Sequence, residues 1–345
     1  MSITCVALLS GGLDSILAIR LMQEQGIDVH ALNFQTVFTC CKDESGRAAS
    51  ELSVPLTVIG DDDEYLQLIR RPRFGYGKGA NPCVDCRIYM FARAKRFLDQ
   101  IGGQFVVSGE VVGQRPMSQK RRDLEIISAH SGLEDLLLRP LSAQFLPLTL
   151  PERNGWVDRS KLHRFSGRSR KGLIELARRF GLSRIPSPSN GCALTETSFG
   201  HKVHDLVQLD HGNRRWDFEL LKVGRHYRLK SGQKVVVGRN EKDNEALQYM
   251  TAREDARAEM LLEPENFIGP AAMVVGLSDR DTLPAAGALL LRHASRCDSD
   301  APTVRVTRTN GIESYPLNLD AVDAASTARN VSERHPPRPN GGPTP

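Results

Sequence analysis

The sequence lacks the features that mark membrane and secreted proteins. It contains no run of 18 or more apolar residues, so we expect no membrane-spanning helix and no membrane partner. The first ten residues are largely apolar, but Gly11, Gly12 and Asp14 interrupt the pattern at once, unlike a secretory signal peptide. We therefore expect a cytoplasmic protein.

The chain also lacks a Gly-x-x-x-x-Gly-Lys-Ser/Thr loop, which argues against hydrolysis of a nucleotide γ-phosphate. Cysteine is scarce, with seven in 345 residues. In a reducing compartment such cysteines are more often free, metal-binding or catalytic than paired in disulfides. Neither sign of charge predominates over the whole chain, because 46 Lys and Arg stand against 41 Asp and Glu, a net charge of +5. Residues 159–184, however, hold nine Lys or Arg and one acidic residue, a bias that indicates contact with a polyanion.

Apolar runs alternate with helical patterns through the first half of the chain. The expected strands cover 3–9, 28–34, 55–60 and 105–109, and the clearest helix covers 84–101, ending at Gly102-Gly103. This alternation predicts an α/β fold with a doubly wound parallel sheet over residues 1–208. Shorter alternating segments predict a small α+β domain over 209–310. The Pro-rich end predicts a disordered tail over 322–345.

The turn Ser10-Gly11-Gly12-Leu13-Asp14-Ser15 stands between the first expected strand and its helix. Backbone N–H groups at a helix N-terminus bind anions, and glycines allow phosphate to approach the backbone closely. Asp14 would repel phosphate directly, so we expect it to act in catalysis by holding Mg²⁺. The expected nucleotide-binding residues are Ser10, Gly11, Gly12, Leu13, Asp14, Ser15, Asn33, Gly109, Glu110 and Gln114.

This turn resembles the PP-loop of the ATP pyrophosphatases, also called adenine nucleotide α-hydrolases, whose pattern is Ser-Gly-Gly-x-Asp-Ser after a first strand. The resemblance implies a doubly wound α/β fold and cleavage of ATP to AMP and pyrophosphate. It does not specify the second substrate.

Three of the seven cysteines, Cys83, Cys86 and Cys192, are candidates for sulfur or metal chemistry. Cys83 and Cys86 open the helix at 84–101, and we expect thiolate character there because of the helix N-terminus, Arg87 and Lys95. Cys192 lies in the loop Ser189-Asn190-Gly191-Cys192. One interpretation is a persulfide relay in which Cys192 carries sulfur and Cys86 resolves it. The other is a 4Fe–4S cluster held by Cys83, Cys86 and Cys192 with one iron site open. Both stay open, beside a purely structural role.

The chain resembles the tRNA-thiolating branch of the PP-loop superfamily in several motifs. They are Asn81-Pro82 with Cys86, the Gly191-Cys192 loop, Ser108-Gly109-Glu110, Gly113-Gln114, Ser118-Gln119 and Leu138-Arg139-Pro140-Leu141, which are similar to tRNA 2-thiouridylases and 4-thiouridine synthases. The resemblance implies a tRNA sulfurtransferase that adenylates a uridine carbonyl oxygen and replaces it with sulfur. Its partners would be tRNA, not DNA, and a cysteine desulfurase or other sulfur donor. Arg115 and Gln119 could then line the nucleotide or base pocket.

Residues 224–247 resemble the small RNA-binding domain of fibronectin-binding-type ribosome-rescue proteins, through Val237-Gly238-Arg239-Asn240 and Asn244-Glu245-Ala246-Leu247. Two alternatives to a sulfurtransferase stay open. One is a PP-loop amidotransferase or ligase, which needs no cysteine pair. The other is a nucleotide-sensing RNA-binding protein without catalysis.

Overall fold

The computed structural model describes residues 2–39, 44–182, 184–187, 191–210, 214–319 and 327–333. The chain divides into two compact units, Met1–Ala193 (unit 1) and Leu194–Pro345 (unit 2). The boundary expected from sequence, at 208/209, falls one helix later. That helix, α8 (Thr197–Leu209), packs with unit 2, where its Asp205 is buried and forms an ion pair with Arg228.

Unit 1 contains a five-stranded parallel sheet with the order β3-β2-β1-β4-β5, so the predicted doubly wound α/β fold is confirmed. The strands are β1 (Thr4–Leu8), β2 (Asp28–Gln35), β3 (Leu56–Gly60), β4 (Phe105–Val107) and β5 (Leu137–Leu138). The order reverses beside β1, because β2 and β4 flank it on opposite sides. Ligands of such sheets bind at the carboxyl ends of the strands, at this switch point.

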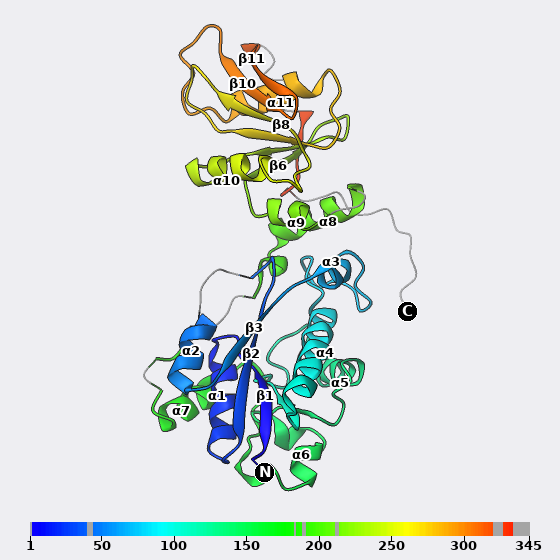
Figure 1. Cartoon of the computed structure of the whole chain (residues 1–345), viewed down its shortest axis with the longest axis vertical. Helices are drawn as coiled ribbons and strands as arrows, with labels where there is room; N and C mark the ends of the chain where they lie inside the picture. Colours follow the sequence, from blue (N-terminus) through cyan, green and yellow to red (C-terminus); the bar gives the residue numbers. More distant parts are fainter. Residues whose placement is uncertain are drawn as a thin grey trace. The chain divides into compact units, whose positions relative to one another are not determined.

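Helices cover both faces of the sheet (Figure 1). One apolar core joins β1 to α1 (Leu13–Gln23), α2 (Glu44–Leu52) and α7 (Lys171–Arg179). A second core joins the other face to α4 (Cys83–Ile101) and α5 (Arg121–His130). The remaining helices of unit 1 are α3 (Asp63–Arg70) and α6 (Leu150–Arg153), with short 3₁₀ turns at Ala143–Phe145, Arg159–Lys161 and Ala193–Thr195.

The helix α4 follows its sequence signals closely. Its apolar side chains Val84, Phe91, Ala94 and Leu98 are buried, and Gly102 ends it in a left-handed conformation with φ of 66°. The expected helix is therefore confirmed to within one residue. Among the residues that the structure describes, no helix is both long enough and apolar enough to cross a membrane.

Unit 2 is built on a seven-stranded antiparallel sheet with the order β11-β10-β8-β9-β7-β6-β12. The strands are β6 (Arg225–Arg228), β7 (Lys234–Val237), β8 (Ala258–Pro264), β9 (Ala272–Val275), β10 (Thr303–Arg308), β11 (Gly311–Pro316) and β12 (Arg329–Asn330). Helix α11 (Thr282–Arg292) packs on one face, and α9 (Arg215–Leu220) and α10 (Glu241–Thr251) on the other. This arrangement confirms the second α+β domain.

The predicted disordered tail over 322–345 is wrong for residues 327–333. Arg329 and Asn330 form β12, which pairs with β6, and Val331 is fully buried. The composition of the segment is poor in apolar residues, but the Arg329 guanidinium lies 2.6 Å from the buried carboxylate of Asp205, and the Val331 N–H donates to the His226 carbonyl at 2.9 Å. The rest of the predicted tail lies outside the described residues.

Candidate functional site

The turn from Ser10 to Ser15 connects β1 to α1 at the carboxyl end of the sheet. Gly11 has φ of 76°, a left-handed conformation that glycine adopts without strain. Gly12 is the N-cap of α1, and Leu13 is its first residue. The Ser15 hydroxyl donates to the Gly12 carbonyl at 2.8 Å. The turn therefore presents the first N–H groups of α1, which have no carbonyl partner within the helix and suit an anion.

Neighbouring segments hold this turn by close backbone contact. A Cβ atom on Gly109 would lie 2.5 Å from the carbonyl carbon of Asp14, and one on Gly11 would lie 2.7 Å from the backbone of Glu44. The Asn33 amide donates to the Leu9 carbonyl at 2.7 Å. Gly109 and Asn33, both expected to bind nucleotide, thus lie at the turn and fix its shape from β4 and β2.

Asp14 is half-buried among polar side chains from two other segments. Burial raises the pKa of its carboxyl group, while a hydrogen bond with Gln114 and the positive charges of Arg170 and Arg115 act in the opposite direction. Arg170 is the N-cap of α7 and also donates to the Pro186 carbonyl at 2.9 Å. We expected Arg170 only among the polyanion-binding residues, but it lies beside the turn. Two guanidinium groups next to a helix N-terminus can neutralise a triphosphate.

Glu110 takes part in a buried ion pair. Its side chain is 2% exposed, and Oε2 accepts from Nε of the buried Arg139 at 2.9 Å. The second oxygen, Oε1, lies 3.6 Å from Nε of Arg87. Arg139 also donates to Ser128 Oγ at 3.0 Å. Glu110 therefore ties the end of β4 to the Leu138–Leu141 segment, and its expected contact with a nucleotide stays a prediction.

The loop after β4 is ordered by Gln119. Its side-chain oxygen accepts from the Arg115 N–H at 3.1 Å, and its carbonyl accepts from the Gly113 N–H at 2.6 Å. Gln119 is buried, and these bonds shape the loop that presents Gln114 and Arg115.

The two cysteines of Cys83-Val84-Asp85-Cys86 lie in the first turn of α4. The Asn81 amide nitrogen lies 3.1 Å from the Cys83 sulfur. Asp85, which sequence analysis did not single out, accepts from the N–H groups of Arg73 at 2.9 Å and Phe74 at 3.0 Å. This carboxylate binds the loop that contains Arg73 and Phe74 to the start of α4, where both cysteines lie.

The expected thiolate character of Cys86 is wrong. Burial of its thiol raises the pKa to about 11, and the nearby positive charge of Arg87 offsets this only in part. Lys95, the other cation we invoked, lies one helical turn from Asp99 and pairs with it at 2.6 Å. Desolvation disfavours the charged form more than a helix terminus favours it. Cys86 is therefore a thiol at neutral pH.

Tyr65 is a functional candidate that sequence analysis missed. Its hydroxyl lies 3.7 Å from the Cys86 sulfur, and this hydrogen bond lowers the Cys86 pKa. The charges of Cys83 and Cys192 both act on Cys86, and that of Cys192 also acts on Tyr65. Cys83 and Cys192 thus lie near enough to act on Cys86, which is partly exposed, whereas Cys192 is exposed to solvent.

The three sulfurs do not form a cluster-binding arrangement in this structure. Among residues 2–39, 44–182, 184–187, 191–210, 214–319 and 327–333, no group of three His, Cys, Asp or Glu side chains is placed to hold a metal ion. Cys5 is buried in β1, as expected for a core residue, and Cys297 belongs to unit 2. Cys40 and Cys41 lie outside the described residues.

The cysteine group and the phosphate-binding turn lie at the same edge of the sheet. Tyr65 forms a hydrogen bond with Thr36, the residue that follows β2. The turn at Ser10–Ser15 follows β1, and β1 and β2 are adjacent parallel strands. The carboxyl ends of both strands therefore bring the two predicted sites to one side of unit 1.

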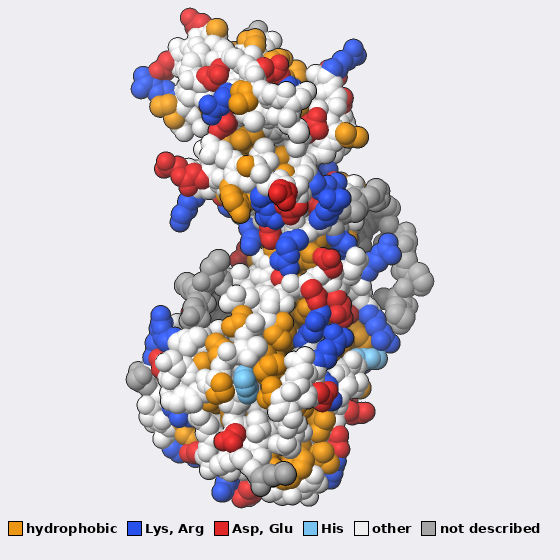
Figure 2. Space-filling view, in the orientation of Figure 1, with side chains coloured by type: hydrophobic (Ala, Val, Ile, Leu, Met, Phe, Trp, Pro, Cys, Tyr) orange, Lys and Arg blue, Asp and Glu red, His pale blue; other side chains and the backbone are white. Residues whose placement is uncertain are grey.

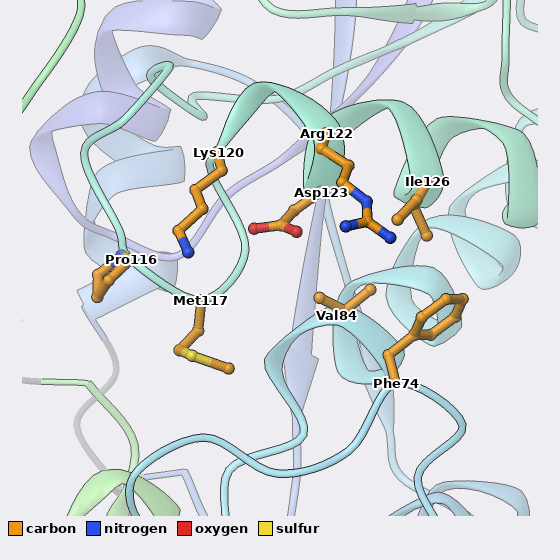
Figure 3. Close-up of a pocket in the computed structure, with 8 residues that line it drawn as sticks. All are labelled: Phe74, Val84, Pro116, Met117, Lys120, Arg122, Asp123 and Ile126. Carbon is orange, nitrogen blue, oxygen red and sulfur yellow. The ribbon is translucent and has the colours of Figure 1, made fainter. Parts of the chain in front are cut away.

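A small cavity of about 220 Å³ lies beside the start of α4 and α5. Figure 3 shows Lys120 and Asp123 facing it from the start of α5, opposite Val84 and Phe74, with Met117 beside them. Ligand pockets usually measure about 300–1,000 Å³, so we assign no ligand to this one.

The basic segment at 159–184 is only partly available to a polyanion. Arg159 donates to the carbonyls of Ala143 at 2.7 Å and Leu146 at 3.0 Å. The guanidinium groups of Arg164 and Arg179 lie over aromatic rings, 5.4 Å and 5.5 Å from the centroids of Phe145 and Phe180. The exposed members without such an inward role are Lys161, Arg168, Lys171, Arg178 and Arg184.

Comparison with known protein families gives two matches, one in each unit. Residues 1–144 match the family described as thiamine biosynthesis protein (ThiI), and residues 224–329 match the NFACT protein RNA binding domain. Both resemblances inferred from the sequence motifs are thereby confirmed. The first match covers the phosphate-binding turn, Cys83 and Cys86, and the second covers most of the antiparallel sheet.

Individual relatives are distant and match over part of their length. A probable tRNA sulfurtransferase of Thermococcus kodakarensis is 30% identical over 146 residues, which are 39% of this chain and 36% of the relative. A tRNA-specific 2-thiouridylase MnmA of Clostridium perfringens is 28% identical over 119 residues, 29% of this chain and 33% of the relative. The chain thus spans about a third of the length of these relatives. A solved complex of a 4-thiouridine synthetase with RNA and ATP is 20% identical, with a TM-score of 0.33, covering 64% of this chain and 52% of that one.

Proposed function

We propose that this protein is an ATP-dependent tRNA sulfurtransferase that converts a uridine into a thiouridine. The observation that carries the proposal is the presence, at one edge of one parallel sheet, of the Ser10–Ser15 turn at a helix N-terminus and of Cys86, on which Cys83 and Cys192 act. The similarity of the first unit to the ThiI family and to curated tRNA thiolation enzymes supports the same assignment.

ATP is the proposed co-substrate, and activation of the uridine is the first step. The carbonyl oxygen of the base attacks the α-phosphorus of ATP, the bond to the β-phosphate breaks, and pyrophosphate leaves. In this step the N–H groups at the start of α1 would bind the phosphates, and Arg115 and Arg170 would neutralise the departing charge. Adenylation turns a stable carbonyl oxygen into part of a leaving group.

Mg²⁺ fits the donor set at the turn. Asp14, in the same turn as Ser10 and Ser15, offers a half-buried carboxylate, and Mg²⁺ is usually held by one or two carboxylates together with substrate phosphates. Bound there, the ion would supply charge neutralisation at the phosphates. Asp14 would hold it.

We propose a persulfide relay for the sulfur step. A sulfur donor, such as a cysteine desulfurase, loads exposed Cys192 with a sulfane sulfur. That terminal sulfur attacks the activated ring carbon, and AMP leaves with the former carbonyl oxygen. Cys86 then attacks the Cys192 sulfur, the bond to the sulfane sulfur breaks, and thiouridine leaves with the proton that Cys86 loses. The resulting Cys86–Cys192 disulfide needs an external dithiol before the next turnover.

The relay needs fewer thiols in one place than a cluster does. Cys86 must lose its proton to attack the Cys192 sulfur, and Arg87 and the Tyr65 hydroxyl favour that loss against the effect of burial. A 4Fe–4S cluster requires three convergent thiolates, and the described residues do not provide that group. We therefore route no step through a cluster, and Cys83 is left without a part in the sulfur step.

The test is a reconstitution with the full chain, ATP, Mg²⁺, an unmodified tRNA transcript, cysteine and a cysteine desulfurase. We expect tRNA-dependent pyrophosphate release, and thiouridine in the digested tRNA by mass spectrometry. Cys86→Ser and Cys192→Ser should release pyrophosphate without forming thiouridine, and Cys83→Ser should remain active.

Each alternative gives a different result. A brown protein that loses both colour and activity in Cys83→Ser would replace the relay with a cluster. Pyrophosphate release that requires ammonia, with a nitrogen-containing product, would make the protein an amidotransferase or ligase. Nucleotide binding without pyrophosphate release in any condition would leave only a nucleotide-sensing RNA-binding protein.

A further inference from the structure

Unit 2 contains a cavity of about 450 Å³ that no motif of the sequence indicated. Four of its lining side chains are basic, and one is acidic; they are Lys202, Lys222, Arg225, Arg239 and Glu196. Figure 2 shows Lys and Arg side chains gathered on this part of unit 2, around α8 and α9. The lining of the cavity therefore has more basic than acidic side chains, and one of the basic ones, Arg239, pairs with Asp243 beside it.

Lys202 forms the inner wall of this cavity. The residue is 8% exposed, and its ammonium group donates to the carbonyls of Leu221 at 3.2 Å and Gly224 at 3.0 Å. An ammonium group has three N–H donors, so these two bonds leave one for a ligand. A buried ammonium group with only carbonyl partners is costly, and an anion in the cavity would offset that cost.

The arginines of the cavity are fixed in place. Arg225 donates to the Gly238 carbonyl at 3.0 Å. Arg239 donates from Nε to Asp243 at 2.6 Å and from Nη2 to the Lys222 carbonyl at 3.2 Å. Because these bonds restrict both side chains before any ligand arrives, a ligand pays little entropy for ordering them. Lys222 itself is exposed at the surface of unit 2.

We propose that this cavity binds a backbone phosphate of an RNA. A phosphate offers the several acceptor oxygens that one lysine and two pre-ordered guanidinium groups require. The cavity also contains the N-terminal turn of α8, through Glu196 and Ser198, whose N–H groups favour an anion. Exposed Lys222 and Arg239 extend the positive charge onto the surface, where a chain of phosphates can continue.

This proposal rests on the proposed function, in which the substrate is an RNA, and adds the site that holds it. The site includes parts of the chain outside residues 224–329, which match the RNA binding domain. Glu196, Ser198 and Lys202 come from α8, and Asn330 and Ser332 come from the segment of β12. The RNA-binding surface of unit 2 therefore extends beyond the matched domain.

The experiment measures binding of a labelled unmodified tRNA transcript to the full chain, without ATP, across several salt concentrations. Lys222→Glu should weaken binding by at least about fivefold at an ionic strength near 0.15 M, the worth of one phosphate contact. The salt slope should fall by about one. Lys202→Met should also weaken binding and lower the salt slope, provided that this variant with a buried substitution folds. Lys222→Glu changes an exposed position, so folding does not limit its use. The matched control is Lys230→Glu, an exposed lysine of unit 2 that does not line the cavity.

Each outcome is decisive for the cavity. Loss of affinity and slope in Lys222→Glu but not in Lys230→Glu supports the phosphate site. An equal loss of tRNA affinity in both variants overturns the phosphate site, because any lysine of the surface would then contribute equally. No loss in either variant overturns it too, because the cavity would then contribute nothing to binding. If AMP or inorganic phosphate binds the cavity and Lys222→Glu abolishes only that binding, the ligand is a free phosphate compound and the RNA assignment is wrong. Since binding is measured without catalysis, a chain that forms no thiouridine can still pass this test.

Discussion

The two units each enclose one titratable side chain among arginines, but the balance of charge around the two differs. Burial raises the pKa of Asp14 in unit 1, and the neighbouring arginines Arg170 and Arg115 oppose that shift. Burial lowers the pKa of Lys202 in unit 2, and the neighbouring cations Arg239 and Lys234 lower it further. Asp14 thus has two cations near it, whereas Lys202 has two cations and one carboxylate, Asp243, near it.

This difference separates two ways of preparing a site for phosphate. In unit 1 a carboxylate stands among the cations, so a metal ion and a triphosphate can share the turn with neither sign in large excess. In the cavity of unit 2 the basic side chains outnumber the acidic ones, and an anion from outside can balance the excess positive charge. The first arrangement suits chemistry on phosphate, and the second suits holding a phosphate that does not react.

The largest effect should come from removing the charge of Asp14. Asp14→Asn keeps the shape of the side chain, and we expect pyrophosphate release to fall by about a hundredfold to a thousandfold. Because burial favours the neutral form of this carboxyl, the substitution should not lower the melting temperature. Asp99→Asn, on an exposed carboxylate paired with Lys95, is the control and should retain full activity. Normal pyrophosphate release by Asp14→Asn would remove the phosphate-binding turn from the mechanism.

The second effect concerns stability and should be confined to unit 2. Asp205 is 1% exposed and pairs with Arg228 at 2.9 Å and Arg329 at 2.6 Å. Asp205→Ala leaves Arg228 buried with fewer partners, which costs about 3–5 kcal/mol for a buried pair. Hydrogen exchange should show lost protection in β6 and β7 with α1 and β1 unchanged. Asp298→Ala, in an exposed pair with Arg296, should cost less than about 1 kcal/mol.

The candidate site of unit 1 could be proposed from the sequence, whereas that of unit 2 could not, for a physical reason. The phosphate-binding turn is six consecutive residues at a strand–helix junction, so its geometry follows from local rules. The cavity of unit 2 draws on residues from 196 to 332, which only the folded sheet brings together. No short motif could have shown it.

Within unit 1 the features that the sequence did not show have one common origin. The buried ion pair of Glu110 joins it to Arg139, which is 29 residues away in the sequence. Cys86 looked like a thiolate because Arg87 is its neighbour in the sequence, whereas the burial that outweighs Arg87 depends on the whole fold. Local charge is visible in a sequence, but desolvation is not.

The third prediction uses the titration of Lys202. Its pKa is lowered to about 8, so below that pH the ammonium group is charged and can bind phosphate. Raising the pH from about 7 to about 9 deprotonates it, and tRNA affinity should fall by up to about tenfold. Arg239, Lys234 and Asp243 act on Lys202. Arg239 and Asp243 keep their charges in this range, because their ion pair raises the pKa of Arg239 and lowers that of Asp243. Burial lowers the pKa of Lys234, so the comparison needs a variant without Lys202. Lys202→Met should bind weakly at both pH values with no slope between them. An equal pH slope in both proteins would show that another group titrates.

The smallest effect should come from Tyr65. It tests whether neighbouring groups shift the pKa of the Cys86 thiol, as they shift the pKa of the Asp14 carboxyl group. Burial raises the pKa of Cys86 to about 11, and Arg87 and the Tyr65 hydroxyl lower it. Tyr65→Phe removes only the hydroxyl, so the Cys86 pKa should rise further, and alkylation of Cys86 at a fixed pH should slow by about threefold. The rate is followed against pH by mass spectrometry of the Cys86 peptide. Tyr89→Phe, whose hydroxyl donates to Asp62 at 2.9 Å, is the matched control. If Tyr65→Phe leaves the pH profile of alkylation unchanged, the hydroxyl only packs against the sulfur, and Arg87 alone opposes the effect of burial.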